Sequence, residues 1–198
     1  MKIKCRIIGF DLDGTLLNSE KHIAEHTREV LTRAVEQGIW ILPVTGRPLG
    51  GLPKEVVEFP GVQYAITANG ARIMETQTGG CLYERLVPVK TAEQIMEIFS
   101  DYDALREVYY GGKGYAEAEE FSRVGEYMRS PQMAAYVRAT RTPVPDILQL
   151  IREKGQDTDK VQGVFKIDEE RTEARKRLEA VEGIEVTGAL SHNIEVNA

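Results

Sequence analysis

Two aspartates, Asp11 and Asp13, stand one residue apart directly after the apolar run Ile7–Phe10. A carboxylate is costly at the end of a core strand unless a cation compensates it, and two carboxylates this close repel each other. Because side chains alternate along a strand, both leave on the same face and can address one substrate. Gly14 then permits a tight turn that brings a backbone amide near an anion. The pattern indicates a site for a metal ion and a phosphate group.

The elements that must position these aspartates alternate between strand and helix over the first 70 residues. The pattern predicts strands over residues 3–10, 39–44 and 62–66, an amphipathic helix over 18–38, and a shorter helix over 49–57. Such alternation implies right-handed crossovers and a doubly wound parallel sheet, whose ligands lie at the carboxyl ends of the strands. The residues expected at these ends are Asp11, Asp13, Thr45 and Asn69.

From residue 71 onward the pattern changes to hairpins mixed with helices. Residues 71–75 and 81–87 predict the first hairpin. Further strands are predicted over 107–110, 113–118, 160–167, 184–187 and 193–196, and helices over 91–102, 119–129, 146–154 and 168–181. Asp168 is the expected N-cap of the last helix, and the prolines at 143 and 145 are expected to break the chain. An α+β layer separate from the first domain is therefore predicted, with a boundary near Cys81.

The composition narrows the class of protein. The chain has 198 residues, 42% of them apolar, which suffices for one medium domain or two small ones. Its net charge of -6, with acids and bases mixed, provides no basic stripe, so we expect no nucleic-acid partner. We expect no membrane partner and a cytoplasmic protein, because no long apolar run and no signal-peptide core are present. Cys5 and Cys81 are expected to be buried, reduced thiols.

Three short motifs resemble one known family. The segment Asp11-Leu-Asp-Gly-Thr15 after an apolar strand resembles the first motif of the haloacid dehalogenase (HAD) superfamily of phosphohydrolases. Val44-Thr45-Gly46-Arg47 resembles the second motif, and Asn69-Gly70-Ala71 resembles the hinge segment of Cof-type phosphatases, where a cap domain is inserted. Taken alone, the second motif and the hinge segment are each an ordinary turn. For Asn69-Gly70 the two interpretations are compatible, because the same residues can form a turn and serve as a hinge.

The resemblance implies a role for each matching residue. Asp11 would be the nucleophile that forms an aspartyl phosphate, and Asp13 the general acid and base. Both would also be ligands of the Mg²⁺ cofactor. Arg47 either steers phosphate or lies on the first turn of a solvated helix. The residues that would bind phosphate or substrate are Gly14, Thr15, Thr45, Gly46, Arg47 and Asn69.

The resemblance also implies a domain plan and a substrate class. Cof-type members have a Rossmann-like core and a large cap that contributes substrate specificity. Residues 1–81 would then be the N-terminal part of the core, residues 82–192 the cap, and residues 193–198 a return segment. Members of this branch are magnesium-dependent phosphatases that act on small phosphorylated metabolites, such as sugar phosphates and phosphorylated cofactors.

The sequence departs from the family pattern after the cap. A lysine that neutralises the nucleophile and phosphate, and an acidic loop that holds magnesium, are expected there and do not follow. Several core strands and helices would be missing as well, leaving one side of the sheet unpaired. Either the chain is truncated, or a homodimer or swapped partner completes the core. Weak or no phosphatase activity is expected of these 198 residues alone.

Two other functions remain open from the sequence. A phosphotransferase or phosphomutase would pass the aspartyl phosphate to a sugar hydroxyl. A non-catalytic module would bind a phosphorylated metabolite without turnover. A phospho-acceptor receiver domain fits less well, because those chains lack a cap and do not place Gly-Thr directly after the paired acids.

Overall fold

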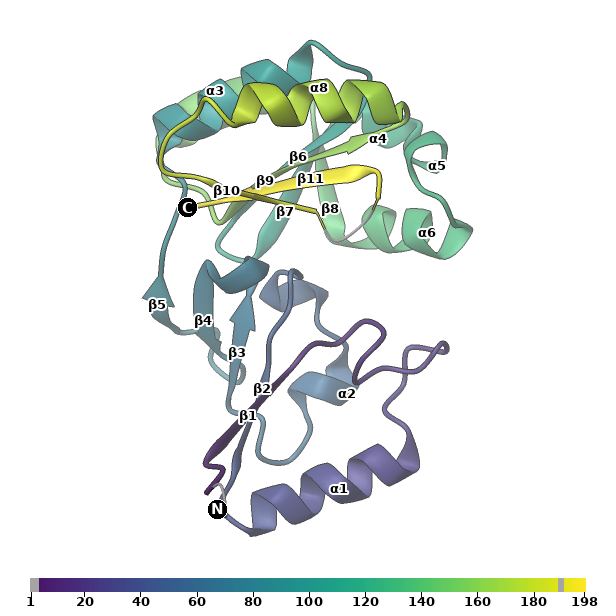
Figure 1. The fold of residues 1–198 in the computed structure, drawn as a ribbon, viewed down its shortest axis with the longest axis vertical. Helices are drawn as coiled ribbons and strands as arrows, with labels where there is room; N and C mark the ends of the chain where they lie inside the picture. The colour runs from purple at the N-terminus through teal and green to yellow at the C-terminus, as the bar shows by residue number, and fades with distance from the viewer. Residues whose placement is uncertain (1–3, 189–190) are drawn as a thin grey trace. The chain divides into compact units, whose positions relative to one another are not determined.

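The computed structural model describes residues 4–188 and 191–198, and it divides into two compact units at the Glu84–Arg85 peptide bond (Figure 1). The predicted start of the first strand at Ile3 and part of the predicted turn before residue 193 lie outside the described residues. Within the described ranges, no helix is long and apolar enough to cross a membrane.

The first unit alternates strands and helices and ends in an antiparallel hairpin. Its elements are β1 (Ile7–Phe10), α1 (Glu25–Glu36), β2 (Trp40–Pro43), η1 (Leu49–Gly51), α2 (Lys54–Val57), β3 (Tyr64–Thr67), η2 (Ala68–Gly70), β4 (Arg72–Glu75) and β5 (Cys81–Glu84). Strands β1 and β2 are parallel, and a single parallel bridge joins Val44, directly after β2, to Ile66 of β3. Strands β3, β4 and β5 are antiparallel. The predicted parallel order followed by a hairpin is confirmed.

One face of this sheet forms the core of the first unit. Ile41 and Ala65 are fully buried, and α1 packs against them through Leu31. On β2, Trp40 is 45% exposed and stacks on the Tyr64 ring, with 6.0 Å between ring centroids. Strand alternation therefore divides the sheet into a buried face and a face that exposes aromatic surface.

The first helix begins later than predicted. The apolar spacing suggested a helix from residue 18, but α1 starts at Glu25 and a loop precedes it. In this loop the Asn18 side chain accepts hydrogen bonds from the backbone amides of Glu20 and His22, both at 3.0 Å. This local turn competes with helix formation, as asparagine side chains often do.

The two cysteines are free, as predicted, but they are exposed instead of buried. Cys5 precedes β1, and Cys81 begins β5, whose four residues are all exposed. Strand-like sequence surroundings do not guarantee burial, because a strand such as β5, which pairs only with β4 in its sheet, has fewer neighbours to cover it.

The second unit is built on one six-stranded sheet. Its elements are α3 (Val89–Ser100), β6 (Ala104–Tyr110), β7 (Lys113–Glu117), α4 (Ala118–Ser122), α5 (Val124–Tyr127), α6 (Pro131–Thr140), β8 (Arg141–Val144), α7 (Ile147–Lys154), β9 (Lys160–Phe165), α8 (Asp168–Leu178), β10 (Glu185–Thr187) and β11 (Asn193–Asn197). The strand order is β10-β11-β9-β6-β7-β8, and only the β7–β8 pair is parallel.

Helices pack on both faces of this sheet. Alternate residues such as Val108, Val161 and Ile194 form one core with α3, α7 and α8. The intervening residues Leu105 and Val164 form a second core with α5 and α6. The period-two alternation of each strand thus provides both faces with apolar residues.

Part of the second face buries charges instead of apolar groups. Glu107 is fully buried and accepts hydrogen bonds from the Arg141 guanidinium at 3.2 Å and from the Tyr109 hydroxyl at 2.6 Å. The Arg141 guanidinium also lies over the Tyr109 ring, 4.9 Å from its centroid. Next to them, Lys160 forms an ion pair with Glu195 at 3.3 Å. These charges tolerate burial because each has an opposite partner.

The domain boundaries differ from the prediction at both ends of the second unit. Strand β5, assigned partly beyond the boundary, pairs with β4 and so belongs to the first unit. Residues 193–198, predicted as a return segment, instead contain β11, which lies between β10 and β9. Ile194 and Val196 are fully buried in this position, so their alternation accounts for the strand.

Several local predictions in the second unit need correction. Two short helices, α4 and α5, replace the single helix predicted over 119–129, and α6 was missed. The segment expected to break the chain forms β8, whose Pro143 is tolerated because β8 is an edge strand. The N-cap of α8 is Ile167, not Asp168, and it makes no side-chain capping bond. The predicted hairpins β6–β7 and β10–β11 are confirmed.

Candidate active site

The first aspartate pair lies on an exposed loop that buried leucines hold in place. Asp11 and Asp13 are exposed, while Leu12 between them is fully buried. The backbone amide of Leu17 donates to the Leu12 carbonyl at 2.9 Å, and Gly14 turns the chain with a φ of +80°. The alternation predicted from the sequence thus places apolar side chains inward and carboxylates outward.

The Asp13 carboxylate binds two cationic side chains. Arg47 donates from Nε to Oδ2 at 2.9 Å and from Nη2 to Oδ1 at 2.8 Å. The ammonium group of Lys21 donates to Oδ1 at 2.8 Å. Two parallel bonds from one guanidinium fix a carboxylate in orientation as well as in charge. The aspartate of the first motif is therefore bound directly to the arginine of the second.

These contacts change the acidity of Asp13. Partial burial alone would raise its pKa, but the hydrogen bonds from Arg47 and Lys21 outweigh this effect and hold the pKa below its ordinary value. The group is consequently ionised at neutral pH and accepts hydrogen bonds or protons more readily than it donates them.

Lys21 was not identified from the sequence. It lies in the loop before α1 with a φ of +65°, a conformation that non-glycine residues rarely adopt. The turn is closed by Asn18, whose amide donates to the His22 carbonyl at 2.9 Å and whose carbonyl accepts from the Lys21 amide at 3.0 Å. Asn18 was the available sequence signal, because asparagine favours such turns, but the helical spacing around it concealed the loop.

The loops after β2 and β3 are joined through their backbones. The amide of Ala68 donates to the Arg47 carbonyl at 3.0 Å, and the amide of Asn69 donates to the Thr45 carbonyl at 3.1 Å. Thr45 is 5% exposed, and its Oγ1 accepts a hydrogen bond from the Arg47 amide at 3.2 Å. Arg47 also donates from Nη1 to the Gly51 carbonyl at 3.0 Å. The side chain that binds Asp13 is thereby anchored at its own loop.

The loop after β3 has an unusual backbone. Ala68, Asn69 and Gly70 all have positive φ, at +49°, +60° and +100°. A run of left-handed residues is unfavourable for alanine, and it persists here because the two amide bonds to the β2 loop hold it. Asn69 and Gly70 tolerate this conformation better than other residues, which explains the turn signal in the sequence.

The structure places some of the predicted site residues in direct contact and links others only through the backbone. Asp13 and Arg47 are in direct contact, and Thr45 and Asn69 are linked through the backbone. Among the described residues, the carboxylate of Asp11 has no hydrogen-bond or ion-pair partner. The side chains of Arg47 and Asp13 are 19% and 42% exposed. Arg47 thus does not lie on a solvated helix, because its guanidinium binds Asp13, and its role in steering phosphate stays a prediction.

Few carboxylates are available as ligands for a divalent cation in this part of the molecule. No three His, Cys, Asp or Glu side chains of residues 4–188 and 191–198 gather into a metal-binding group. Asp11 and Asp13 supply oxygen atoms, the ligand type that Mg²⁺ prefers. Of these, the exposed Asp11 carboxylate fits this role better, because the Asp13 carboxylate already binds Arg47 and Lys21.

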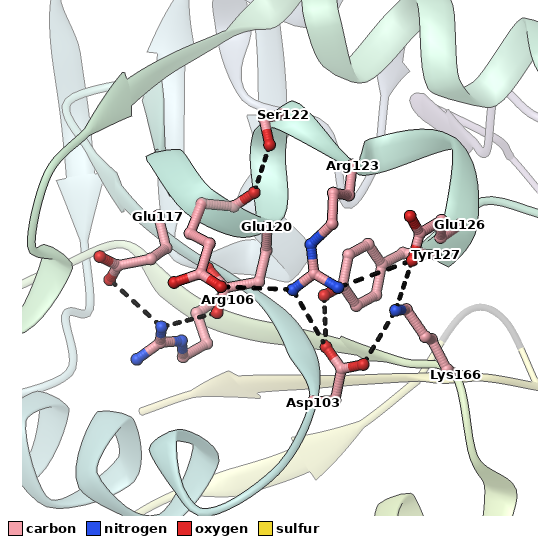
Figure 2. Close-up of polar contacts among 10 residues, drawn as sticks. Asp103, Arg106, Glu117, Glu120, Ser122, Arg123, Glu126, Tyr127 and Lys166 are labelled. Atoms are coloured by element: carbon pink, nitrogen blue, oxygen red, sulfur yellow. Dashed lines mark hydrogen bonds and ion pairs between the residues drawn. The ribbon is translucent and has the colours of Figure 1, made fainter.

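A second polar cluster, in the second unit, is structural in character (Figure 2). Lys166 donates to Asp103 at 2.8 Å and to Glu126 at 2.6 Å, and the Tyr127 hydroxyl donates to Asp103 at 2.5 Å. Arg123 completes the cluster with ion pairs of 3.6 Å to Asp103 and Glu126. The charges balance one another, and the cluster ties α5 to the ends of β6 and β9.

Comparison with known proteins decides the family. The family model for haloacid dehalogenase-like hydrolases matches residues 8–198. The chain belongs to this family. The resemblance inferred from the three motifs is therefore confirmed.

Solved structures of HAD-like hydrolases share this fold. One from Bacteroides thetaiotaomicron is 25% identical, with a TM-score of 0.75, and the alignment covers 98% of this chain and 71% of that one. One from Bacillus subtilis is 24% identical, with a TM-score of 0.80, and the alignment covers 98% and 73%.

Curated relatives match over shorter stretches. The HMP-PP phosphatase of Klebsiella pneumoniae (strain 342) is 31% identical over 107 residues, which are 54% of this chain and 39% of that protein. The chain thus spans less than half the length of this curated relative.

Proposed function

We propose that this HAD-like hydrolase is a magnesium-dependent phosphatase that acts on a small phosphorylated metabolite through an aspartyl-phosphate intermediate. The observation that carries the proposal is the bidentate contact between Asp13 and Arg47. It joins the acid of the first motif to the loop of the second, at the carboxyl ends of β1 and β2. Family membership and the phosphatase name of a relative support the same reaction class.

In this proposal Asp11 is the nucleophile. Its carboxylate is exposed, and no described residue engages it, so an oxygen atom is available to attack phosphorus in line. The bond from phosphorus to the leaving oxygen breaks as the bond to Asp11 forms, and water later displaces phosphate from Asp11. One hydrolysis is thus divided into two displacement steps.

Asp13 serves as the general acid and base. To protonate the leaving oxygen, Asp13 must first take up a proton against the effect of Arg47 and Lys21. The carboxylate that remains after this transfer accepts a proton from the attacking water. The contacts with Arg47 and Lys21 favour this ionised form and fix its orientation. Both cations also reduce the repulsion between the aspartates and a phosphate dianion.

Phosphate recognition is assigned to the surrounding loops. The Gly14–Thr15 turn and the loop of Thr45 and Gly46 offer amide and hydroxyl donors, which stabilise charge on phosphoryl oxygens. Asn69, held by its amide bond to Thr45, lies at the same loop cluster. Mg²⁺, held by Asp11 and by oxygen atoms at Asp13, would supply positive charge against the phosphoryl group.

The second unit, from Arg85 onward, is proposed to act as the cap that selects the substrate. Its compact core and separate sheet support an independent unit of this kind. Caps of this sort exclude bulk water and place side chains near the substrate. Selection of the metabolite is therefore assigned to side chains of the second unit.

The proposal is tested by hydrolysis of p-nitrophenyl phosphate by the complete protein, with and without Mg²⁺. Turnover by the wild-type protein is expected to require Mg²⁺ and to be weak for these 198 residues alone. Asp11→Asn should abolish it, because the nucleophile is gone. Asp13→Asn is expected to lower kcat by about 10²–10⁴-fold, the usual contribution of general acid–base catalysis. Glu97→Gln, an exposed change on α3, is the matched control and should retain full activity.

Trapping of the phosphorylated protein distinguishes a phosphatase from a phosphotransferase and from a non-catalytic module. When the substrate carries a radioactive phosphate, rapid acid quenching should recover the label on the wild-type protein and none on Asp11→Asn. Activity that survives Asp11→Asn contradicts the mechanism. Transfer of the label to an added sugar phosphate instead of to water indicates a phosphotransferase, and saturable substrate binding without turnover indicates a non-catalytic module.

A further inference from the structure

The second unit contains a buried histidine whose ring has no hydrogen-bond partner among the described residues. His192 is 5% exposed, and neither Nδ1 nor Nε2 has a hydrogen-bond partner in the part of the chain that the structure describes. Its backbone is fixed, because its carbonyl accepts a hydrogen bond from the Phe165 amide at 2.8 Å. Buried polar atoms are almost always hydrogen-bonded, so two unsatisfied ring nitrogens on a well-anchored residue call for a ligand.

A cavity lies beside this ring. Its volume is about 190 Å³, and its lining residues are Met128, Arg129, Ser130, Met133, Ser191 and His192. This volume accommodates a molecule of a few non-hydrogen atoms and is smaller than a typical drug-sized pocket. The two methionines provide adaptable apolar walls. Ser130 is the N-cap of α6, and its hydroxyl accepts the Met133 amide at 3.2 Å.

The surroundings of the cavity favour an anion. The Arg129 side chain is 60% exposed, and its only ion pair in the described chain is a long one of 3.8 Å to Asp168. Burial, with the positive charges of Arg129 and Arg171, lowers the pKa of His192 despite the opposing effect of Asp168. The ring is therefore neutral at neutral pH and offers one N–H donor and one acceptor nitrogen.

We propose that this cavity binds a small hydroxycarboxylate. The carboxylate pairs with the Arg129 guanidinium and accepts the His192 N–H. The hydroxyl group donates to the other ring nitrogen, and a short apolar group contacts Met128 and Met133. Such a ligand would contact the arginine, both nitrogens of the histidine ring and the two methionines, whereas a simple inorganic anion would leave the methionines uncovered. All residues that line the cavity belong to the second unit, and the binding can be measured without reference to phosphatase activity.

Nuclear magnetic resonance tests this site directly with lactate as the probe. The complete protein is labelled with ¹⁵N in histidine rings and with ¹³C in methionine methyl groups. Lactate is expected to shift the His192 ring nitrogens and the methyl groups of Met128 and Met133 saturably, with a dissociation constant of about 1 mM, typical of very small ligands. His22 and His26, both on exposed segments, serve as internal controls and should not shift.

Matched ligands and variants identify the groups involved. Propionate lacks the hydroxyl and glycerol lacks the charge, so both are expected to bind at least about tenfold more weakly. Arg129→Gln should weaken lactate binding by about tenfold or more, whereas Arg138→Gln, an exposed arginine of α6, should leave it unchanged.

Three results would overturn the inference. The first is a set of His192 and methionine signals that do not respond to lactate. The second is equal loss in the Arg129 and Arg138 variants, which would indicate nonspecific attraction. The third is equal binding of propionate and lactate, which would remove the hydroxyl contact. Because Arg129 is exposed, its variant is expected to fold, and a native spectrum checks this independently.

Discussion

The buried pair of Glu107 and Arg141 should be essential for the stability of the second unit. Their side chains are 0% and 6% exposed, and the closest nitrogen and oxygen atoms are 3.2 Å apart. Two unit charges at this distance attract by about 5 kcal/mol at an effective dielectric constant of about 20. Glu107→Gln removes this attraction and leaves the Arg141 charge buried, which typically costs about 3–5 kcal/mol. Stacking on Tyr109 compensates part of it, so we expect about 3 kcal/mol.

Native-state hydrogen exchange of backbone amides in β6 and β9 measures this change within the second unit. Glu97→Gln is the matched control, because Glu97 pairs with Arg152 at 3.0 Å while both side chains are more than half exposed. Such surface pairs contribute little, so a change below about 0.5 kcal/mol is expected. Adding Arg141→Met to Glu107→Gln should restore part of the loss, because no buried charge remains unpaired.

A loss below about 1 kcal/mol for Glu107→Gln would refute the reasoning, because the neutral amide would then serve Arg141 as well as the carboxylate does. So would a double variant no more stable than Glu107→Gln alone. Either result would mean that neighbouring aromatic rings or solvent stabilise the guanidinium. The calculation of the buried attraction would then not apply to this sheet.

Three further predictions concern single groups. Gly61→Ala should destabilise the first unit by about 2 kcal/mol or more in urea unfolding, because φ is +93° and the new Cβ would lie 2.6 Å from a valine methyl of α1. Gly38→Ala, with φ of +75° and open space around it, should cost less; equal costs would contradict the clash. The pKa of Asp13 lies below its ordinary value of 3.8, so its ion pair stabilises the fold above pH 3.8, and this stabilisation is lost as the pH falls further. Arg47→Met should flatten this acid dependence of the free energy of unfolding. Parallel curves of unfolding free energy against pH for the two proteins would argue against it. Burial raises the pKa of Tyr110 to about 12, so the free energy of unfolding should fall between pH 10 and 12, and Tyr110→Phe should reduce that fall. Within the described chain the buried Tyr110 hydroxyl has no hydrogen-bond partner, so the same variant should not be destabilised at pH 7.

The sequence predicted the site best where chemistry and local pattern coincide. Asp13 and Thr45 follow apolar strands, so their placement at strand ends needed only the alternation of elements. Lys21 was missed because its role depends on a left-handed turn that closes through backbone bonds, while nearby apolar residues match helical spacing. Local periodicity does not report such competition between side-chain and helical hydrogen bonds.

The buried charges of the second unit were beyond sequence reasoning for a different reason. Glu107 and Arg141 lie 34 residues apart and meet only because β6, β7 and β8 are neighbours in the sheet. Alternating charged residues in a strand normally indicate a solvated face. Only the order of strands shows that these two cancel each other.

The single tryptophan of the chain makes the first unit optically distinct. Trp40 stacks on Tyr64 at the partly exposed face of β2, so its fluorescence depends on that sheet remaining intact. Excitation at a wavelength selective for indole therefore follows the melting of the first unit alone, while tyrosine and circular dichroism signals include the second. A difference between the two melting curves would reveal stepwise unfolding without any added label.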